Sequence, residues 1–435
     1  MQAEEVAQAR PHGLSRRLVR QVAEIPGCAA PRIDAIVVPT NRPAAYLGFA
    51  ASLAAEAGAR LVVMCSGSAR AQDIGGLMTG QTAQEFIGVQ VPDGFSHPLV
   101  GFLSSHDGDA AEGRQGDISL KRNLGLLMGR AMRWRRLLFL DDDTRGIGTV
   151  DLVRASLLLR STSAVGFFID EFPDHSVVGH ALRLAQATQQ TFVSGGALMV
   201  DPSAPAPFFP DIYNEDWLFL CDWTRRRRLT SAGYARQLAY APFDDPARAH
   251  REEFGDLLAE GLHQLIDQGR RIRDAGTAFW AGQLAERRQR ITWSAEAVRR
   301  STAVSDALRE RVVIALRAAV ARLDQINPAS PGRFIDAWRG DLRVWAARYR
   351  EIPPLGSLAK ALDQLSLAAE VTAPVPRQDL APLASTGGSR DCRKARIANR
   401  LEPPRYVRAP PAGFRSRRRR RRGILGLVRA ARLVG

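Results

Sequence analysis

The chain has 435 residues, of which 45% are hydrophobic and 24% charged, a composition typical of folded globular proteins. This length exceeds that of one ordinary compact domain, so we expect two folded units with tails. The net charge of +16 comes mostly from the end of the sequence, where from Arg390 onward 16 Lys and Arg face only Asp391 and Glu402, a net of +14. The nearly neutral remainder argues against a basic nucleic-acid groove on the main domain.

The spacing of the cysteines and the length of the apolar runs indicate the cellular compartment of the protein. Cys28, Cys65, Cys221 and Cys392 are far apart and show no zinc-type spacing, which favours reduced thiols. The N-terminal region lacks the apolar stretch of a signal peptide, and no run of about 18 apolar residues is available to span a membrane. We therefore expect a cytoplasmic protein without a transmembrane segment.

Strand and helix patterns alternate after a short helical lead over residues 1–30. Residues 33–38 are apolar except for one Asp and predict a buried strand, and residues 60–65 predict a second one. The Ala- and Leu-rich residues 44–58 between them predict a helix, so the three segments form a βαβ unit with a parallel sheet. Residues 71–116 are rich in Gly, Asp, Ser and His and predict irregular connections with one short strand.

After this irregular segment, the pattern predicts a helix over 118–132 that leads into an apolar strand over 135–140. Further strands are predicted over 164–169 and 192–200, the second broken at Ser194-Gly195-Gly196. Period-3.6 patterns then predict helices from residue 252 to about 367, with breaks at Asn327-Pro328 and Pro353-Pro354.

These patterns predict an α/β fold with a mixed, mostly parallel Rossmann-type sheet flanked by helices. We expect a catalytic domain over residues 31–255 and a helical domain or appendage over 256–370. Residues 371–435, rich in Pro, Arg, Ser and Gly, predict a disordered basic tail.

Three consecutive carboxylates, Asp141, Asp142 and Asp143, follow the apolar strand over 135–140. Ligands of open α/β sheets bind at the carboxyl ends of strands, and like charges packed together favour a bound cation. Oxygen ligands select a hard ion, Mn²⁺ or Mg²⁺, which commonly bridges to substrate phosphates. A solvated acidic turn or a helix cap before Thr144 is the structural alternative.

The order of several motifs resembles the GT-A glycosyltransferases, especially the inverting family 2 type. The likeness covers residues 31–255. Its motifs are Pro39-Thr40-Asn41-Arg42 after the first strand, Lys121-Arg122-Asn123 on the helix, Asp141-Asp142-Asp143 as an Asp-x-Asp motif, Ser194-Gly195-Gly196-Ala197, and Asn214-Glu215-Asp216-Trp217. The second strand ends in Ser66-Gly67-Ser68, where that family commonly has an acid that reads the base, so the nucleotide is left unassigned.

The resemblance implies a role for each matched position. Asp216 would be the general base, with Glu215 binding the acceptor; the dipole of a helix N-terminus is the structural alternative for this acidic pair. Asp141 and Asp143 would hold the metal, with His250 as a possible further ligand or else a surface histidine. The donor nucleotide would contact Pro39, Thr40, Asn41, Arg42, Lys121, Arg122, Asn123, Asp141 and Asp142, and the acceptor Gly195, Gly196 and Trp217.

The implied reaction is transfer of a sugar from a nucleoside-diphosphate sugar to an acceptor hydroxyl, with a divalent metal stabilising the diphosphate. One alternative is a nucleotidyltransferase, although no Gly-rich phosphate loop follows the first strand. Another is a protein that binds a polyanion or an anionic membrane surface through Arg417–Arg422 and the apolar residues after it.

Overall fold

The computed structural model describes residue 19 and residues 32–74, 85–112, 116–170, 176–187 and 193–372. The predicted helical lead lies outside these residues except for Val19, and the predicted tail lies outside them from residue 373 onward. The chain divides into two compact units, Met1–Ala395 and Arg396–Gly435, and the second lies wholly outside the described residues.

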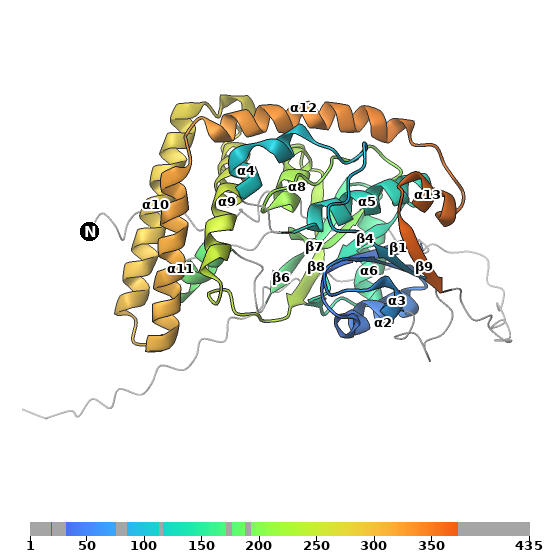
Figure 1. Ribbon diagram of the computed structural model, residues 1–435, viewed down its shortest axis with the longest axis horizontal. Helices are drawn as coiled ribbons and strands as arrows, with labels where there is room; N and C mark the ends of the chain where they lie inside the picture. Colours follow the sequence, from blue (N-terminus) through green and yellow to red (C-terminus); the bar gives the residue numbers. More distant parts are fainter. Residues whose placement is uncertain are drawn as a thin grey trace, which may run out of the picture. The chain divides into compact units, whose positions relative to one another are not determined.

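A nine-stranded sheet in the order β5-β8-β6-β7-β4-β1-β2-β3-β9 forms the centre of the first unit (Figure 1). Strands β1 (Ala35–Thr40), β2 (Arg60–Cys65), β3 (Phe86–Gln90) and β4 (Leu137–Leu140) run parallel to one another. The predicted βαβ unit is confirmed, with the 3₁₀ turn Ala44–Leu47 and helix α2 (Gly48–Ala57) between β1 and β2.

The other half of the sheet has more antiparallel than parallel pairings, but β6 and β8 run in the direction of β1, so the sheet is mixed, as predicted. Strand β7 (Val193–Val200) pairs antiparallel with β4 and with β6 (Ala164–Asp170), while β8 (Leu229–Gln237) runs parallel to β6. The two-residue β5 (Thr144–Arg145) pairs antiparallel with β8. Strand β7 continues through the break predicted at Ser194-Gly195-Gly196, although its pairing with β6 shifts register over that stretch.

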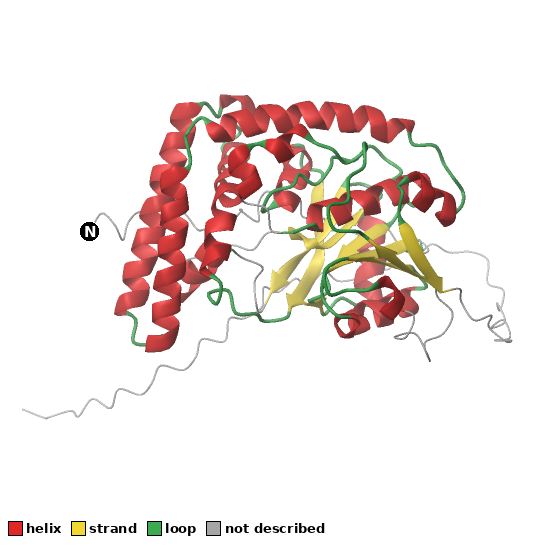
Figure 2. Cartoon of the chain, viewed as in Figure 1, coloured by secondary structure: helices red, strands yellow, loops and turns green. Residues whose placement is uncertain are grey.

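Both faces of the sheet are buried, as the alternation along β1 shows. Ala35 and Val37 belong to one hydrophobic cluster, and Ile36 and Val38 to the other. The second cluster is completed by α2, α3 (Ala71–Ile74) and α6 (Thr149–Leu158). The first and larger cluster is completed by the helices from α4 to α13 other than α6, on the opposite face (Figures 1 and 2).

The helices of the larger cluster come from both halves of the chain. Its earlier members are α4 (Gly108–Glu112), which follows the 3₁₀ turn Leu103–His106, α5 (Ile118–Ala131), α7 (Val177–Leu184) and α8 (Glu215–Arg225). Its later members are α9 (Pro246–Asp267), α10 (Thr277–Arg300), α11 (Asp306–Gln325), α12 (Ser330–Glu351) and α13 (Leu358–Gln364). A short 3₁₀ turn, Ile272–Asp274, joins α9 to α10.

Two features connect the predicted helical region to the sheet. The boundary expected between residues 255 and 256 falls inside α9, which runs unbroken from Pro246 to Asp267. After α13, the chain forms β9 (Ala368–Thr372), which pairs antiparallel with β3 at the edge of the sheet. The described helical region therefore begins and ends in contact with the α/β part.

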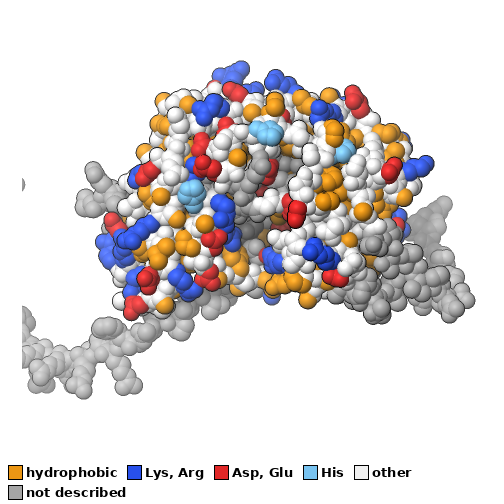
Figure 3. Space-filling model, in the orientation of Figure 1, with side chains coloured by type: hydrophobic (Ala, Val, Ile, Leu, Met, Phe, Trp, Pro, Cys, Tyr) orange, Lys and Arg blue, Asp and Glu red, His pale blue; other side chains and the backbone are white. Residues whose placement is uncertain are grey.

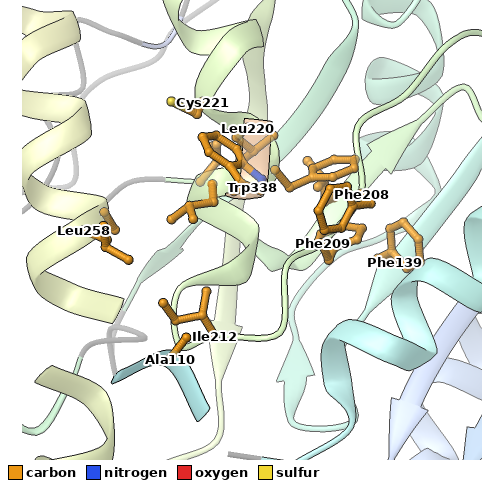
Figure 4. Close-up of a cluster of buried hydrophobic side chains, with 14 of the residues drawn as sticks. Ala110, Phe139, Phe208, Phe209, Ile212, Leu220, Cys221, Leu258 and Trp338 are labelled. Carbon is orange, nitrogen blue, oxygen red and sulfur yellow. The ribbon is translucent and has the colours of Figure 1, made fainter. Parts of the chain in front are cut away.

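Aromatic side chains such as Phe139, Phe208 and Phe209 pack within the larger cluster (Figure 4). Phe139 of β4 meets Phe209 edge to face at 5.4 Å between ring centroids, and Phe209 stacks on Phe219 of α8 at 3.9 Å. Offset and edge-to-face pairs add about 0.5–1.5 kcal/mol each beyond the burial of their surface. This packing ties β4 and α8, the two elements that carry acidic motifs, to one core.

Two further expectations concern the charge of the surface and the absence of a membrane-spanning helix. On the face shown in Figure 3, Lys and Arg side chains are interspersed with Asp and Glu and form no single basic patch. None of the helices in the described ranges has the length and apolarity required to cross a membrane.

Candidate functional site

A cavity of about 660 Å³ lies where β1 and β4 end and α8 begins. It is lined by the first-strand loop Pro39–Arg42, by Lys121 and Arg122, by Asp141–Asp143 and by Asp211–Trp217. Ser194 also lines it, so residues of all five sequence motifs meet at one place. Its charged lining comprises seven acidic residues, Asp117, Asp141, Asp142, Asp143, Asp211, Glu215 and Asp216, and four basic ones, Arg42, Lys121, Arg122 and Arg248.

The three aspartates form a tight turn directly after β4. The amide of Asp141 donates to the Gly196 carbonyl at 2.9 Å, and the amide of Thr144 donates back to the Asp141 carbonyl at 3.0 Å. Because β1 lies next to β4, the loop after β1 faces this turn. Thr40 Oγ1 donates to Asp142 Oδ2 at 2.5 Å, and Arg42 Nη2 lies 2.8 Å from Asp143 Oδ2.

Burial changes the protonation of these carboxylates. It raises the pKa of Asp142 to about 6, although the Thr40 hydroxyl and Arg42 act in the opposite direction. Burial also raises the pKa of Asp141, with Asp143 adding to the effect and Arg122 opposing it. The turn therefore holds negative charge at a cost, and a cation at this position would lower that cost.

Arg122 connects the aspartate turn to the acidic pair on α8. Its Nη2 donates to Asp141 at 2.8 Å, and its Nη1 contacts Glu215 Oε1. The side chain is only 2% exposed. Burial disfavours its charge, but Asp141, Glu215 and Asp216 raise the pKa of the guanidinium above its ordinary value. Arg122 is thus a fixed cation between the two acidic groups.

Lys121 and Asn123 are used mainly inside the protein. Lys121 Nζ donates to the Thr40 carbonyl at 2.8 Å and to Ser66 Oγ at 2.6 Å, and it pairs with Asp117 at 2.8 Å. Burial lowers the pKa of this ammonium. Asn123 does not line the cavity and instead exchanges two hydrogen bonds of 2.8 Å with the backbone of Phe209. Lys121 fixes the first-strand loop, whereas Asn123 fixes a core segment.

Gly195 and Gly196 leave room for charged side chains. A Cβ on Gly195 would lie 2.5 Å from Arg122 Nη1, and one on Gly196 would lie 3.0 Å from Asp141 Oδ2. Both glycines are buried in β7, and of their motif only Ser194 lines the cavity. The double glycine is thus explained by the approach of Arg122 and Asp141.

The acidic pair begins α8, where the helix dipole favours negative charge. Asp216 accepts the Gly195 amide on Oδ2 at 2.6 Å and the Trp217 amide on Oδ1 at 2.8 Å, so both of its oxygens are oriented. Burial raises the pKa of Glu215 to about 8, Asp216 adds to this shift, and Arg122 opposes it. Asp216 is an oriented carboxylate at the cavity wall, while Glu215 is largely committed to Arg122.

Of the two remaining residues expected at the site, one lines the cavity and the other does not. Trp217 lines the cavity beside Asp216, but His250 of α9 is not among the lining residues. In the described ranges, no group of three or more His, Cys, Asp or Glu side chains is arranged to hold a metal ion. A protein-only metal cage is therefore absent from that part of the chain.

Arg248 and Tyr240, which no sequence pattern indicated, also line the cavity. Arg248 Nε donates to the buried Glu252 at 2.6 Å, and its guanidinium lies 4.6 Å from the centroid of the Tyr240 ring. Arg248 is two residues from His250 in a charged segment that carries no pattern of its own. Only the fold shows that this arginine reaches the cavity.

The fold and the cavity define a mixed α/β protein with an acidic site at the carboxyl ends of its strands, the usual position of ligand sites in such sheets. Comparison with known proteins adds no family, since no protein-family model and no curated protein matches the chain.

Proposed function

We propose that the chain is a metal-dependent glycosyltransferase of the GT-A kind, which moves a sugar from a nucleoside-diphosphate sugar to an acceptor hydroxyl. One observation carries this proposal. The Asp141–Asp143 turn, the loop after β1 and the oriented Asp216 all line a single cavity at the ends of the strands. Glycosyl transfer needs such a pair of acidic sites, one for the leaving diphosphate and one for the acceptor proton.

The residues of the aspartate turn fit a divalent cation. Mg²⁺ and Mn²⁺ prefer oxygen ligands, and Mg²⁺ usually takes only one or two carboxylates, with substrate phosphates and water completing the shell. Asp141 and Asp143 would supply the carboxylates, and the excess of acids over bases in the lining favours a cation. Arg42, whose side chain is 40% exposed, would release Asp143 and turn to a phosphate. The metal, when bound, would act as a Lewis acid toward the diphosphate.

The protein groups have separate roles in this proposal. Thr40 and Lys121 hold the loop after β1 against the aspartate turn, which would form the nucleotide side. Arg122 is the counterion of both Asp141 and Glu215, so that neither carboxylate is left buried without one. Asp216 would accept the proton of the acceptor hydroxyl, held for that purpose by two backbone amides. Trp217 would form part of the acceptor wall.

The test is calorimetric titration and thermal shift with uridine, guanosine and adenosine diphosphates, with and without Mn²⁺. Ligand binding to the folded state alone raises stability by mass action. We expect at least one nucleotide to bind in a Mn²⁺-dependent manner, and Asp143→Ala to remove that dependence while the fold persists. Asp93→Ala, at an exposed loop position, is the matched control.

Two results would count against the proposal. The metal assignment fails if Asp143→Ala binds the nucleotide with the same Mn²⁺ dependence as the unsubstituted chain. Release of the nucleoside diphosphate from sugar donors, with water as acceptor, tests the chemistry without knowledge of the acceptor. A chain that binds the nucleotide but never cleaves any donor sugar would point to a binding role.

A further inference from the structure

Helix α8, which carries Asp216, begins at an unusual backbone position. Asn214 directly precedes it with φ 62° and ψ 35°, the left-handed region that few residues other than glycine adopt. Its side chain makes no capping bond to the helix. Instead, Asn214 Nδ2 donates to Asp256 Oδ1 of α9 at 2.7 Å. The conformation of this turn is thus supported by a helix that lies far along the chain.

The two backbones are in close contact at the same place. A Cβ on Gly255 would lie 2.2 Å from the Tyr213 carbonyl oxygen, so α9 approaches residue 213 more closely than any side chain would allow. Asp256, the next residue of α9, is 4% exposed. The segment that leads into α8 is therefore held on α9 both by backbone packing and by the bond from Asn214.

Asp256 is in turn fixed by an arginine of α10. Arg287 is 1% exposed, and its Nη2 contacts Asp256 Oδ2. Its Nε and Nη2 also bind Glu253, at 2.6 and 3.0 Å, and its Nη1 binds Glu260 at 3.0 Å. A buried carboxylate needs such a counterion, because removal of one partner from a buried pair leaves an uncompensated charge.

We propose that Asn214, Asp256 and Arg287 form a positioning network through which α9 and α10 set the location of Asp216 at the cavity. The assignment of Asp216 to the acceptor hydroxyl rests on the proposed function. In the contacts of the described residues, the network is bonded neither to the aspartate turn nor to the loop after β1. Asp256 and Arg287 do not line the cavity and act through the start of α8, whereas Asn214 also lines the cavity itself. It gives the helical region from α9 to α10 a part in the reaction.

The first test uses Asn214→Gly. Glycine accepts a positive φ without strain, so this variant removes the bond to Asp256 and keeps the backbone conformation accessible. We expect turnover to fall about 10- to 100-fold, because a shift of about 1 Å at a catalytic group can cost about 10²-fold. Affinity for the nucleotide with Mn²⁺ should stay within about twofold of the original, since the nucleotide side is untouched.

The matched control is Asn327→Gly, the same change at an exposed position between α11 and α12. Rescue sharpens the test. Asn214→Asp places two carboxylates face to face, whereas Asn214→Asp combined with Asp256→Asn restores one carboxylate–amide pair. We expect the double variant to be more active than Asn214→Asp, a non-additive result that a general loss of stability does not produce.

Amide hydrogen exchange makes the test independent of glycosyl transfer. In Asn214→Gly, peptides over residues 213–218 should lose protection while peptides of β4 and the aspartate turn keep it. If the original chain transfers no sugar but this local loss occurs, the proposed function fails and the network stands. Unchanged turnover in an active enzyme, unchanged exchange, or a double variant no better than Asn214→Asp would each overturn the network.

Discussion

The two sides of the cavity are held by different kinds of contact. Asp141–Asp143 and Thr40–Arg42 lie at the ends of β4 and β1, which pair in the sheet from Ala35–Leu137 to Val37–Phe139, so the backbone ladder sets their separation. Glu215 and Asp216 instead depend on a few buried polar contacts, to Arg122, to the Gly195 amide and, through Asn214, to α9. Cooperative backbone pairing tolerates the loss of one side chain, whereas a small set of buried polar contacts does not. The α8 side should therefore be the more sensitive to substitution.

The largest effect is expected from Asp216→Asn, which removes the carboxylate and keeps its shape. Loss of a general base costs about 10²- to 10⁴-fold in rate, whereas loss of a charge at a helix N-terminus costs only about 0.3–1 kcal/mol of stability. We expect turnover to fall and nucleotide binding to remain. Asp222→Asn, on the exposed face of the same helix, is the control. A fully active, slightly less stable variant would assign Asp216 to structure.

The next largest effect, on the free energy of unfolding, is expected at Arg122, the cation that pairs with an acid on each side of the cavity. Arg122→Met leaves Asp141 and Glu215 buried without their counterion, which should lower the free energy of unfolding by about 3–5 kcal/mol. Denaturant titration near neutral pH measures this loss. Arg225→Met, which breaks an exposed ion pair on α8, should cost at most about 1 kcal/mol. Equal losses in the two variants would remove the basis of the comparison.

The stability of the fold should depend on pH through His263, which contacts the backbone of Trp217. The buried His263 ring hydrogen-bonds to the Trp217 carbonyl at 3.0 Å, and burial lowers the pKa of His263 from 6.5 to about 4. The unfolded chain therefore binds more protons between these values, and stability falls as the pH drops from about 6.5 to about 4. The loss from this group is on the order of 3 kcal/mol.

His263→Gln should reduce that slope, because glutamine does not titrate. The measurement is the free energy of unfolding by urea at pH 7 and at pH 4. His106→Gln changes an exposed histidine and should leave the slope as it is. Parallel pH curves for the original chain and His263→Gln would contradict the prediction.

The smallest effect is expected on the side that the sheet holds. Arg42 pairs with Asp143, but its side chain is 40% exposed, so solvent already screens the interaction. Arg42→Ala should change the free energy of unfolding by about 1 kcal/mol or less. A loss comparable with that of Arg122→Met would show that this side also depends on single side chains.

Much of the sheet was predictable, because its central strands are short apolar runs bounded by turn residues. The strand over 60–65 was predicted with its observed ends, and the strands at 164 and 193 were found within one or two residues. Strand β8 was missed, since its sequence around Ser231, Gly233 and Arg236 has no apolar run and its pairing with β6 shifts register there. Tertiary pairing, and not local preference, makes this segment a strand.

The site was predictable where its residues are contiguous. Asp141–Asp143 and Glu215-Asp216 stand out because adjacent acids beside apolar runs are visible in one sequence. The sequence does not show toward which side a helical residue points, so Asn123 was predicted at the nucleotide although it binds the backbone of Phe209. Nor does it show pairs such as Asn214 with Asp256, which are joined only by the packing of α8 on α9.

Because of strand β9, the sheet can be completed only after the C-terminal helices have been synthesised. It covers β3 at the edge of the sheet, yet it comes from the far end of the described chain, after all five C-terminal helices. Until residue 372 leaves the ribosome, that side of β3 presents unpaired backbone groups, the kind of edge on which strands of other chains add. Closing such a long loop is slow, so we expect the pairing of β9 with β3 to form late in folding.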